Sequence, residues 1–438
     1  MTENPFMEIL GSAANELPAL IGTWGTTSYG ELRSLVEHKK SLSRNRSDTP
    51  LLASHPTPEF IASLLAYLSE GIPVALVAPE LSEGELAQRR KILQTKPHPD
   101  CALIVFTSGS TGNPKAVQLS AANLEANTEA VIDSLEFARA PEQKLFLSLS
   151  YSYGLFGQLL PALRLGIPTT ILTRFADARG EFVEGRGAGM WSGVPSHWEA
   201  LLRVTTPEQC EGVTHVISAG AALPLSLRER LKAHFRNATI YNNYGLTEAS
   251  PRVLSFSSKH PRFFEEDTVG LPVKFLKVKE GEGGELEVKG WQVMLGYLGD
   301  EKETAEKLRS GWLRSGDVVH IDADGLVHIV GRLDDLFNIG GERASPLEID
   351  AALLHIPGVK EGAVLVEKHP IYGSQLIAFL VGENIPPKKE ILEKLRQHLS
   401  GHKVPLEYRI VEALPRTPNG KLRRKGLVEM KEQSRKIG

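Results

Sequence analysis

Residues 103–119 read LIVFTSGSTGNPKAVQL. An apolar run leads into a loop of hydroxyl side chains and glycines, and a second run leads out after Lys115. Glycines let backbone N–H groups turn toward an anion, hydroxyls add donors, and the lysine adds a mobile positive charge. The spacing differs from the Walker pattern of Gly, four residues and Gly-Lys-Ser/Thr. The stretch predicts a phosphate-binding loop that joins two strands, followed by a helix with Ser120 as its N-cap.

Length and composition describe an ordinary soluble enzyme. The chain has 438 residues, which predicts two or more domains, and it is 41% hydrophobic and 24% charged. The formal net charge of −3 argues against nucleic acid as a main partner, because binding to a phosphate backbone needs a basic face. No apolar run is long enough for a membrane span, and residues 1–4 lack the pattern of a signal peptide. We therefore expect a cytoplasmic protein.

The chain contains two cysteines, Cys101 and Cys210, which lie far apart and away from any His-Cys cluster. This spacing disfavours both a disulfide framework and a structural zinc site. Two reduced thiols are the simpler interpretation.

The order of elements predicts an α/β fold with a large N-terminal domain and a small mobile α+β domain. Between residues 100 and 330, short apolar runs alternate with amphipathic segments. Strands are expected at residues 145–149, 169–173, 215–218 and 239–241, and a helix is expected at 225–235. After Asp334 the hydrophobic pattern changes and predicts short strands and one helix. The apolar face of that helix carries Ile391, Leu392, Leu395 and Leu399. The predicted domains are residues 1–333 and 334–438.

Further short segments of the sequence contain residues suited to binding a ligand or to catalysis, although each segment alone is also compatible with a turn or a helix cap. They are Ser218–Pro224, Asn242–Glu248, Gly311–Asp317, Gly331–Asp335, Asn338–Arg343 and Leu414–Leu422. In the second of these, Thr247 can bond a phosphate oxygen and Glu248 offers a hard oxygen ligand to Mg²⁺. In the last, two prolines and Asn-Gly predict a stiff turn that presents Lys421.

Together, and in this order, the segments resemble the superfamily of adenylate-forming enzymes, which includes acyl-CoA synthetases, firefly luciferase and the adenylation domains of peptide synthetases. The resemblance covers residues 100–425 and is nearest to an acyl-CoA ligase. It implies ATP, Mg²⁺ and coenzyme A as cofactors. The implied reaction activates a carboxylic acid to an acyl-adenylate and then transfers the acyl group to a thiol, with fatty acid metabolism as one setting.

The resemblance also implies a role for each matching residue. The implied catalytic residues are Lys421, Thr247 and Glu248, of which Glu248 binds the metal. The phosphates are expected to be bound by the loop residues Thr107, Ser108, Gly109, Ser110, Thr111, Gly112 and Lys115. The adenine is expected to be bound by Gly220, Ala221, Tyr244 and Gly245. Asp317 accepts from the ribose hydroxyls, which suits a carboxylate facing a vicinal diol, and Arg332 contacts ribose or phosphate. Asp334 is the hinge, Gly341 in the following loop lines the pantetheine tunnel, and Arg343 can pair with a phosphate.

The acid is expected to lack an α-amine, because the aspartate that binds an α-ammonium in amino-acid-activating relatives is missing from residues 149–154. The predicted pocket residues are Tyr151, Tyr153, Val194 and Ser218, and a fatty or aromatic acid is favoured. Tyr151 stands where many relatives have histidine. Residues 1–100 are shorter than the corresponding segment of most relatives. Two acceptors remain open, coenzyme A and the phosphopantetheine arm of an acyl carrier protein. A catalytically silent nucleotide-binding protein is disfavoured by Glu248, Asp317, Arg332 and Lys421.

Overall fold

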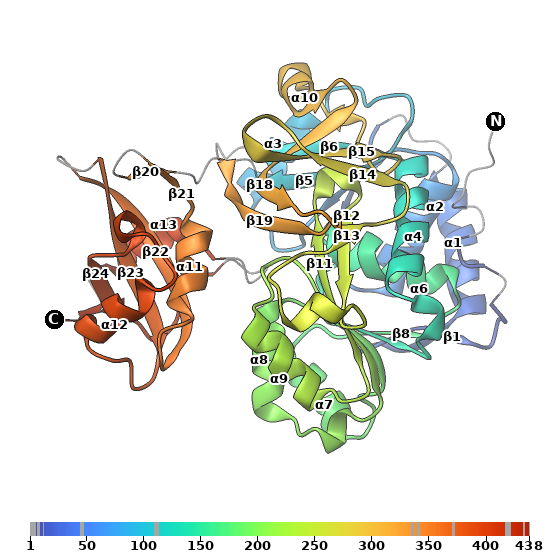
Figure 1. Ribbon diagram of the computed structural model, residues 1–438. Coiled ribbons are helices and arrows are strands. Elements are labelled where there is room, and N and C mark those ends of the chain that lie inside the picture. Colours follow the sequence, from blue (N-terminus) through green and yellow to red (C-terminus); the bar gives the residue numbers. More distant parts are fainter. Residues whose placement is uncertain are drawn as a thin grey trace. The chain divides into compact units, whose positions relative to one another are not determined.

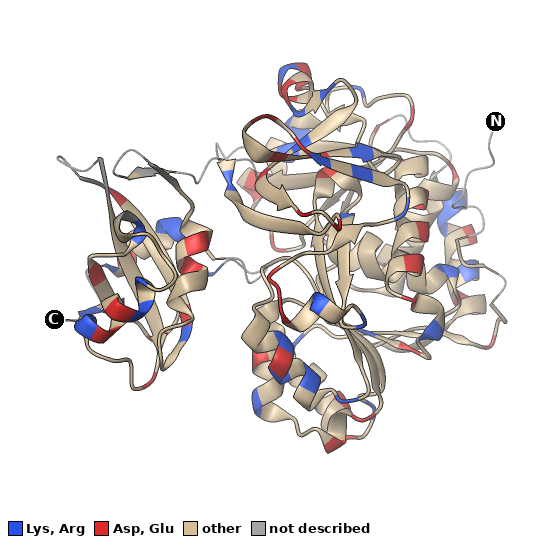
Figure 2. Ribbon diagram, viewed as in Figure 1, with Lys and Arg blue, Asp and Glu red and all other residues tan. Residues whose placement is uncertain are grey.

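The computed structural model describes residues 6, 9–11, 13–43, 48–108, 114–333, 337–339, 342–369, 373–416, 422–431 and 434–437. The contacts between these residues divide the chain into two units. Unit 1 holds residues 1–279 and 287–315, and unit 2 holds residues 280–286 and 316–438. Basic and acidic side chains are interspersed along both units (Figure 2), in keeping with the small net charge.

The larger sheet of unit 1 is mostly parallel at its centre and runs in the order β13-β12-β11-β10-β9-β7-β8-β1-β2 (Figure 1). Its strands are β1 (Pro18–Gly22), β2 (Gly25–Ser28), β7 (Gln143–Leu145), β8 (Thr169–Ile171), β9 (Gly189–Gly193), β10 (Val213–Ser218), β11 (Thr239–Gly245), β12 (Arg252–Ser257) and β13 (Leu271–Pro272). β7, β9, β10 and β11 pair in parallel, whereas β12 returns antiparallel to β11. Parallel neighbours bring their carboxyl ends to one edge, where ligands bind in open α/β sheets.

A second sheet of unit 1 carries the predicted phosphate loop. Its order is β16-β6-β5-β4-β3, from β3 (Leu51–Ala53), β4 (Val74–Val77), β5 (Cys101–Ser108), β6 (Pro114–Ser120) and β16 (Gly296–Tyr297). β5 and β6 are antiparallel, with Thr107 opposite Lys115, so the loop does join two strands as predicted. The following helix α4 (Ala121–Ser134) is capped by Ser120, whose hydroxyl accepts from the backbone N–H of Asn123.

Helices surround these sheets, and some of them begin at a side-chain cap. They are α1 (Tyr29–Ser43), α2 (Pro58–Ser69), α3 (Glu83–Ile92), α5 (Ser152–Gly154), α6 (Leu160–Arg164), α7 (Phe175–Val183), α8 (Pro195–Val204), α9 (Leu225–His234) and α10 (Glu301–Lys307). A π-helical turn, Leu155–Leu159, connects α5 to α6. Thr57 caps α2, and Ser82 with Glu85 forms a reciprocal capping box on α3. None of the helices that the structure describes is both long and apolar enough to cross a bilayer.

The strand expected at residues 145–149 is shorter than predicted, because β7 ends at Leu145. The Ser148 hydroxyl accepts a hydrogen bond from the backbone N–H of Ser150 at 3.2 Å, and the Ser148 carbonyl accepts from the N–H of Tyr151 at 3.4 Å. Such local bonds compete with a sheet ladder. The chain therefore turns here and leads into α5.

A smaller sheet follows along the chain, with the order β14-β15-β18-β17 and β19 on β18. Its strands are β14 (Leu276–Glu280), β15 (Glu285–Gly290), β17 (Leu308–Arg309), β18 (Trp312–Ile321) and β19 (Val327–Arg332). Within unit 2, the remaining strands are β20 (Phe337–Ile339), β21 (Glu342–Ala344), β22 (Val359–His369), β23 (Gly373–Gly382), β24 (Glu407–Ile410) and β25 (Arg435–Lys436), and the helices are α11 (Pro346–Leu353), α12 (Lys388–Leu395) and α13 (Arg424–Met430).

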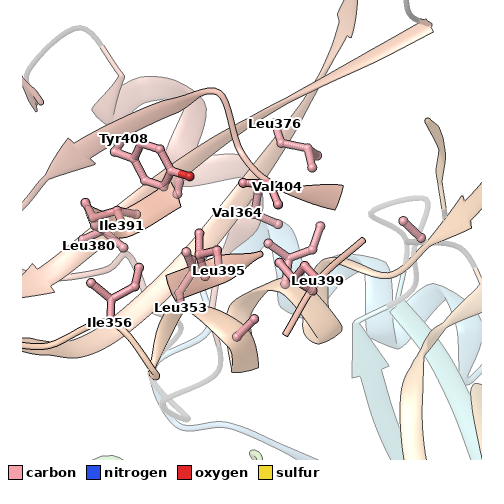
Figure 3. Close-up of a cluster of buried hydrophobic side chains, with 14 of the residues drawn as sticks. Leu353, Ile356, Val364, Leu376, Leu380, Ile391, Leu395, Leu399, Val404 and Tyr408 are labelled. Carbon is pink, nitrogen blue, oxygen red and sulfur yellow. The ribbon is translucent and has the colours of Figure 1, made fainter. Parts of the chain in front are cut away.

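The α+β part of unit 2 has its own apolar core (Figure 3). Ile391, Leu395 and Leu399 are buried there together with Leu353, Val364 and Leu380, and Leu392 packs against the cluster. The apolar face predicted from the sequence is thus the face that packs on the sheet.

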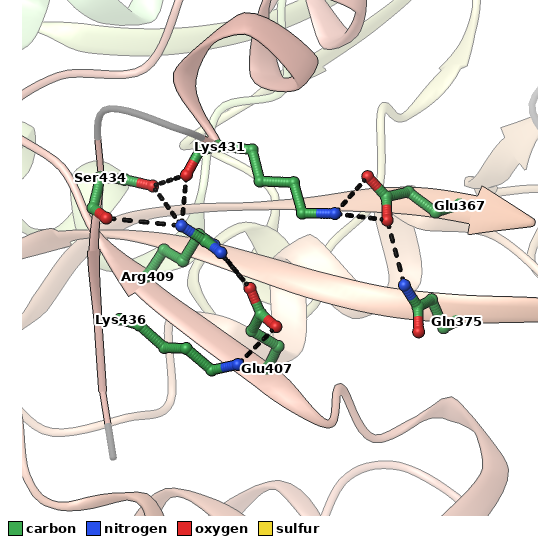
Figure 4. Close-up of polar contacts among 7 residues, drawn as sticks. All are labelled: Glu367, Gln375, Glu407, Arg409, Lys431, Ser434 and Lys436. Atoms are coloured by element: carbon green, nitrogen blue, oxygen red, sulfur yellow. Dashed lines mark hydrogen bonds and ion pairs between the residues drawn. The ribbon is translucent and has the colours of Figure 1, made fainter. Parts of the chain in front are cut away.

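Ion pairs tie the last segment of the chain to the same sheet (Figure 4). Lys431 donates to both carboxylate oxygens of Glu367, at 2.7 and 2.9 Å, and Gln375 donates to Glu367 at 3.0 Å. Glu407 accepts from Arg409 at 2.6 Å and from Lys436 at 2.8 Å. These bonds connect Lys431 to β22 and Lys436 to β24.

Candidate active site

Lys115, at the end of the phosphate loop, is held by two side chains that follow much later in the sequence. Its Nζ lies 2.5 Å from Oε1 of Glu303 on α10 and 5.4 Å from the ring centroid of Tyr297 on β16. Both charged side chains are about three-quarters buried, at 22% and 25% exposed. Gly109–Asn113 and the side chain of Ser108 lie outside the described residues. The loop's cation is therefore pre-positioned, and its roles toward phosphate stay predictions.

Glu248 shares this network through Tyr297. The Tyr297 hydroxyl donates a hydrogen bond to Oε1 of Glu248 at 2.8 Å. Burial, and after it the charge of Glu248, raise the pKa of Tyr297 well above its ordinary value, so the hydroxyl keeps its proton and remains a donor. The carboxylate is thus oriented through one oxygen. Oε2 points to no other partner that the described residues supply, and a hard oxygen of this kind suits Mg²⁺.

Thr247 stands beside Glu248 in a short 3₁₀ turn, Thr247–Ala249. Its hydroxyl lies 3.2 Å from the hydroxyl of Ser152, the first residue of α5. The two hydroxyls connect the predicted phosphate ligand to the segment predicted to bind the acid.

The carboxyl ends of β10 and β11 bring the predicted adenine residues to one edge. Ser218 is opposite Asn242 in the parallel register, and the chain continues through Gly220 at φ +86° and Ala221. At the end of β11, Tyr244 is half-buried and Gly245 is exposed. A Cβ on Gly245 would lie 2.3 Å from the Pro251 carbonyl oxygen. Only glycine allows this approach.

The predicted ribose ligand, Asp317, is joined to the predicted ribose or phosphate ligand, Arg332, in unit 2. The two residues are directly opposite in the β18–β19 pair, and Nη1 of Arg332 lies 3.2 Å from Oδ1 of Asp317. Glu285 accepts from the backbone N–H of Gly316 at 2.8 Å. The carboxylate of Asp317 is therefore held in place by its cationic neighbour.

The loop that carries Lys421 has a stiff base in unit 2. Arg416 forms a β-bridge with Leu422, and the N–H of Arg423 donates to the Pro415 carbonyl at 2.8 Å. Arg424 forms an ion pair with Asp350 and donates to the Val364 carbonyl at 2.9 Å. Thr417–Lys421 themselves lie outside the described residues, as do Asp334, Gly341 and the side chain of Arg343. The roles of Lys421, Asp334, Gly341 and Arg343 stay predictions.

The predicted acid-pocket residues differ in exposure. Tyr151 is 42% exposed, whereas Val194 and Ser218 are buried. Tyr153 is partly buried, and its hydroxyl donates to the carbonyl oxygen of Ile217 at 3.1 Å. The hydroxyl of Ser218 is buried without a hydrogen-bond partner among the described atoms. Tyr153 thus bridges α5 to the end of β10.

Three functional candidates were missed by the sequence interpretation, namely Ser152, Tyr297 and Glu303. Tyr297 comes close to Lys115 because β16, which carries Tyr297, pairs with β6, which carries Lys115. Glu303 is 188 residues away from Lys115 in the sequence. Locally, Glu303 looks like an ordinary first-turn acid, since the Asp300 side chain caps its N–H. No nearby sequence signal reveals its pairing with the loop.

Comparison with known families now adds an independent observation. The model of the AMP-binding enzymes matches residues 88–298, and the model of the AMP-binding enzyme C-terminal domain matches residues 348–421. A sulfoacetate–CoA ligase of Cupriavidus necator is 32% identical over 416 residues, covering 90% of this chain and 79% of the relative. The chain belongs to the AMP-binding enzymes. The resemblance to adenylate-forming enzymes of the acyl-CoA ligase type is thereby confirmed.

Two further comparisons describe how far the likeness extends. Acyl-CoA ligase SID4 of Ajellomyces capsulatus is 32% identical over 369 residues, covering 76% of this chain but 61% of that protein. The solved structure of o-succinylbenzoate CoA synthetase (MenE) from Bacillus subtilis, in complex with the acyl-adenylate intermediate OSB-AMP, matches with a TM-score of 0.81. It is 22% identical, and the match covers 100% of this chain and 99% of that one. This likeness confirms the predicted α/β fold of the AMP-binding enzyme.

Proposed function

We propose that this AMP-binding enzyme uses Mg·ATP to activate a carboxylic acid as an acyl-adenylate and then transfers the acyl group to the thiol of coenzyme A. The observation that carries the proposal is the network Lys115–Tyr297–Glu248, with Thr247 adjoining it. Tyr297 contacts both a cation and a carboxylate, and Thr247, next to that carboxylate in the sequence, adds a hydroxyl; these are the group types that a metal-bound triphosphate requires. The named relatives, an acyl-CoA ligase and a sulfoacetate–CoA ligase, support coenzyme A as the acceptor.

In the first half-reaction, an oxygen of the substrate carboxylate attacks the α-phosphorus of ATP. The bond from that phosphorus to the bridging oxygen breaks, and pyrophosphate leaves. We assign the β- and γ-phosphates to the loop and Lys115, the α-phosphate to Thr247, and the migrating charge to Lys421. Bound at Glu248, Mg²⁺ would neutralise charge on the phosphates. The residues mainly position the reactants and stabilise charge.

Nucleotide recognition is assigned to the residues predicted from the sequence. Gly220 and Ala221 carry no large side chain, which lets a flat base approach the backbone, and Tyr244 packs against the base. Asp317 accepts from the ribose hydroxyls, and its contact with Arg332 orients the carboxylate for that task.

In the second half-reaction, the thiolate of coenzyme A attacks the carbonyl carbon of the adenylate, and AMP leaves. We assign Gly341 to the thiol arm, Arg343 to a phosphate and Asp334 to the hinge between the two steps. We propose an acid without an α-amine whose carbon skeleton is that of a fatty or aromatic acid.

The test is acid-dependent release of pyrophosphate, measured over short, medium, long-chain and aromatic acids, with and without coenzyme A. We expect release with at least one acid class and formation of its acyl-CoA. Turnover that requires a carrier protein in place of coenzyme A would overturn the assigned acceptor. An absence of release with every acid, together with intact ATP binding, would identify a silent nucleotide-binding protein.

A further inference from the structure

Among the described residues of unit 1, two arginines are completely buried, and they differ in their hydrogen bonds. Arg228 is 0% exposed, and its guanidinium donates to backbone carbonyls of Leu223, Phe263 and Thr268 at 2.9 to 3.1 Å. A guanidinium that serves only the fold is thus fully hydrogen-bonded, as expected for a buried charge.

Arg252 is 1% exposed, but its guanidinium lacks such bonds. Nε and Nη2 are buried and make no well-formed hydrogen bond to a described atom; the one polar side chain that interacts with the guanidinium among the described residues is Tyr153, a neutral phenol, and no described carboxylate forms an ion pair with it. Its main neighbour is the ring of Tyr153, whose centroid is 5.2 Å from the guanidinium carbon. Burial lowers the pKa of Arg252, yet arginine does not deprotonate in proteins. A charge is therefore buried without a counter-charge, which is costly for the fold.

The two unpartnered donors have a specific geometry. Nε and Nη2 lie on the same edge of the planar guanidinium. Two parallel N–H groups on one edge match the two oxygens of a carboxylate, and this fork is the reason that arginine recognises carboxylates in a bidentate manner.

Arg252 also occupies a defined place beside the predicted acid pocket. It begins β12 directly opposite Gly245 of β11, and its backbone N–H donates to the side chain of Asn127 at 3.1 Å. Nη2 faces Gly157 in the π-helical turn, where a Cβ would lie 3.4 Å from it. π-helical turns often occur at functional sites. The side chain is fixed between the pocket residue Tyr153 and the end of β11.

We propose, building on the function proposed above, that Arg252 determines acid specificity, and that the acid carries a second carboxylate, which binds side-on to the Nε–Nη2 edge. Both donors are closed to solvent without the acid, so the diacid reaches them by displacing packed neighbours, first of all the ring of Tyr153. The ion pair formed with the guanidinium offsets the cost of this displacement. An acid whose far end is a methyl group leaves the guanidinium unpaired and gains no such offset.

The test compares matched pairs of acids of equal length that differ only at the far end, such as glutarate with valerate, adipate with hexanoate, and terephthalate with benzoate. Acid-dependent pyrophosphate release gives kcat/KM for each acid. For at least one pair we expect the wild-type protein to favour the diacid by about 100-fold or more, because a site built to bond a polar group rejects an analogue without it. In Arg252→Met the diacid should lose about 100-fold, while the monoacid of the same pair is unchanged or improved. Arg252→Lys should retain part of the preference.

Arg228→Met is the matched control, since it removes a buried guanidinium that the fold satisfies internally. It should lower the melting temperature and leave the ratio of diacid to monoacid unchanged. If Arg252→Met fails to fold, the acid preference of the wild-type protein and the effect of Arg252→Lys decide the question. A wild-type preference for monoacids, or an equal loss for both acids of a pair in Arg252→Met, would overturn the role of Arg252 while leaving the proposed ligase intact. Release of pyrophosphate with no acid at all would instead overturn the ligase itself.

Discussion

The hydroxyl of Tyr297 holds the carboxylate of Glu248 at 2.8 Å, and the same ring lies 5.4 Å from the ammonium of Lys115. One aromatic side chain thus contacts both the predicted metal ligand and the predicted phosphate ligand. Neither of those ligands belongs to the strand that carries Tyr297. We therefore expect the arrangement of the predicted ATP site to depend on this residue.

We expect Tyr297→Phe to lower acid-dependent pyrophosphate release about 10- to 100-fold, the usual effect of removing a residue that orients a metal ligand. The Mg²⁺ concentration for half-maximal rate should rise, because Glu248 loses its fixed orientation. The measurement is the rate as a function of Mg²⁺. Tyr408→Phe is the control, since that hydroxyl is buried in the core of unit 2 without a hydrogen-bond partner among the described atoms. An unaltered Mg²⁺ dependence in Tyr297→Phe would remove the role assigned to this hydrogen bond.

Glu303 pairs with Lys115 at 2.5 Å. A triphosphate that binds to Lys115 would therefore compete with the carboxylate of Glu303 for the same ammonium group. We expect Glu303→Gln to lower the KM for ATP by about fivefold or less, corresponding to the ~1 kcal/mol of a partly exposed ion pair. Steady-state kinetics over a range of ATP concentrations measures it. Glu348→Gln, which removes the partner of Lys403 in unit 2, serves as the control and should not alter this KM. A raised KM in Glu303→Gln would show that Glu303 orients Lys115 rather than competing with phosphate.

Lys421 is predicted to stabilise the charge that shifts during adenylation. Lys421→Ala should cut adenylation about 100-fold or more, as for other charge-stabilising donors, and should spare transfer from a supplied acyl-adenylate to coenzyme A. The two half-reactions are measured separately. Lys425→Ala changes an exposed lysine on the adjoining helix α13 and should affect neither. If pyrophosphate formation in Lys421→Ala equals that of the wild type, the assignment of this lysine is wrong.

Two buried histidines make the stability of unit 1 depend on pH. Burial lowers the pKa of His197 to about 4 and that of His215 to about 4. The unfolded chain binds these protons near pH 6.5 and the folded chain only near 4, so the unfolded state gains protons in this interval and stability falls as the pH decreases. Each histidine contributes up to about 3 kcal/mol of this loss.

His215→Phe should therefore flatten the decline of the free energy of unfolding between pH 6.5 and 4, since phenylalanine retains the stacking on Tyr241 without a titrating group. Denaturant unfolding at several pH values measures this slope. The exposed His38, changed to glutamine, provides the reference. A slope equal to that of the wild type in His215→Phe would contradict the burial argument.

Local sequence signals predicted local structure well. The sequence predicted three local features correctly, namely the loop between β5 and β6, the cap at Ser120 and the helix from Leu225. Their signals, which are glycines, hydroxyls and apolar periodicity, act over a few residues. The strand predicted up to Leu149 was wrong beyond Leu145, since bonds from Ser148 redirect the backbone.

Contacts between side chains that are far apart in the sequence were not predictable in this way. Glu248 is 49 residues from Tyr297, and Lys115 is 188 residues from Glu303. Such partners are set by which strands become neighbours in the sheet, and β16 is a two-residue strand with no periodicity of its own. The unsatisfied guanidinium of Arg252 is likewise invisible in the sequence, because only the packing shows which donors lack acceptors.

The close approach at Gly245 has a consequence for directed evolution of the acid range. The space that a Cβ at position 245 would need is occupied by the carbonyl oxygen of Pro251, a rigid backbone group. A mutant library that randomises residue 245 would therefore consist almost entirely of misfolded clones. At Gly157 the atoms nearest to such a Cβ belong to the side chains of Tyr153 and Arg252, so they can be substituted together with residue 157. Diversification directed at residues 153, 157 and 252 would reshape the acid pocket and preserve the turn that carries Thr247 and Glu248.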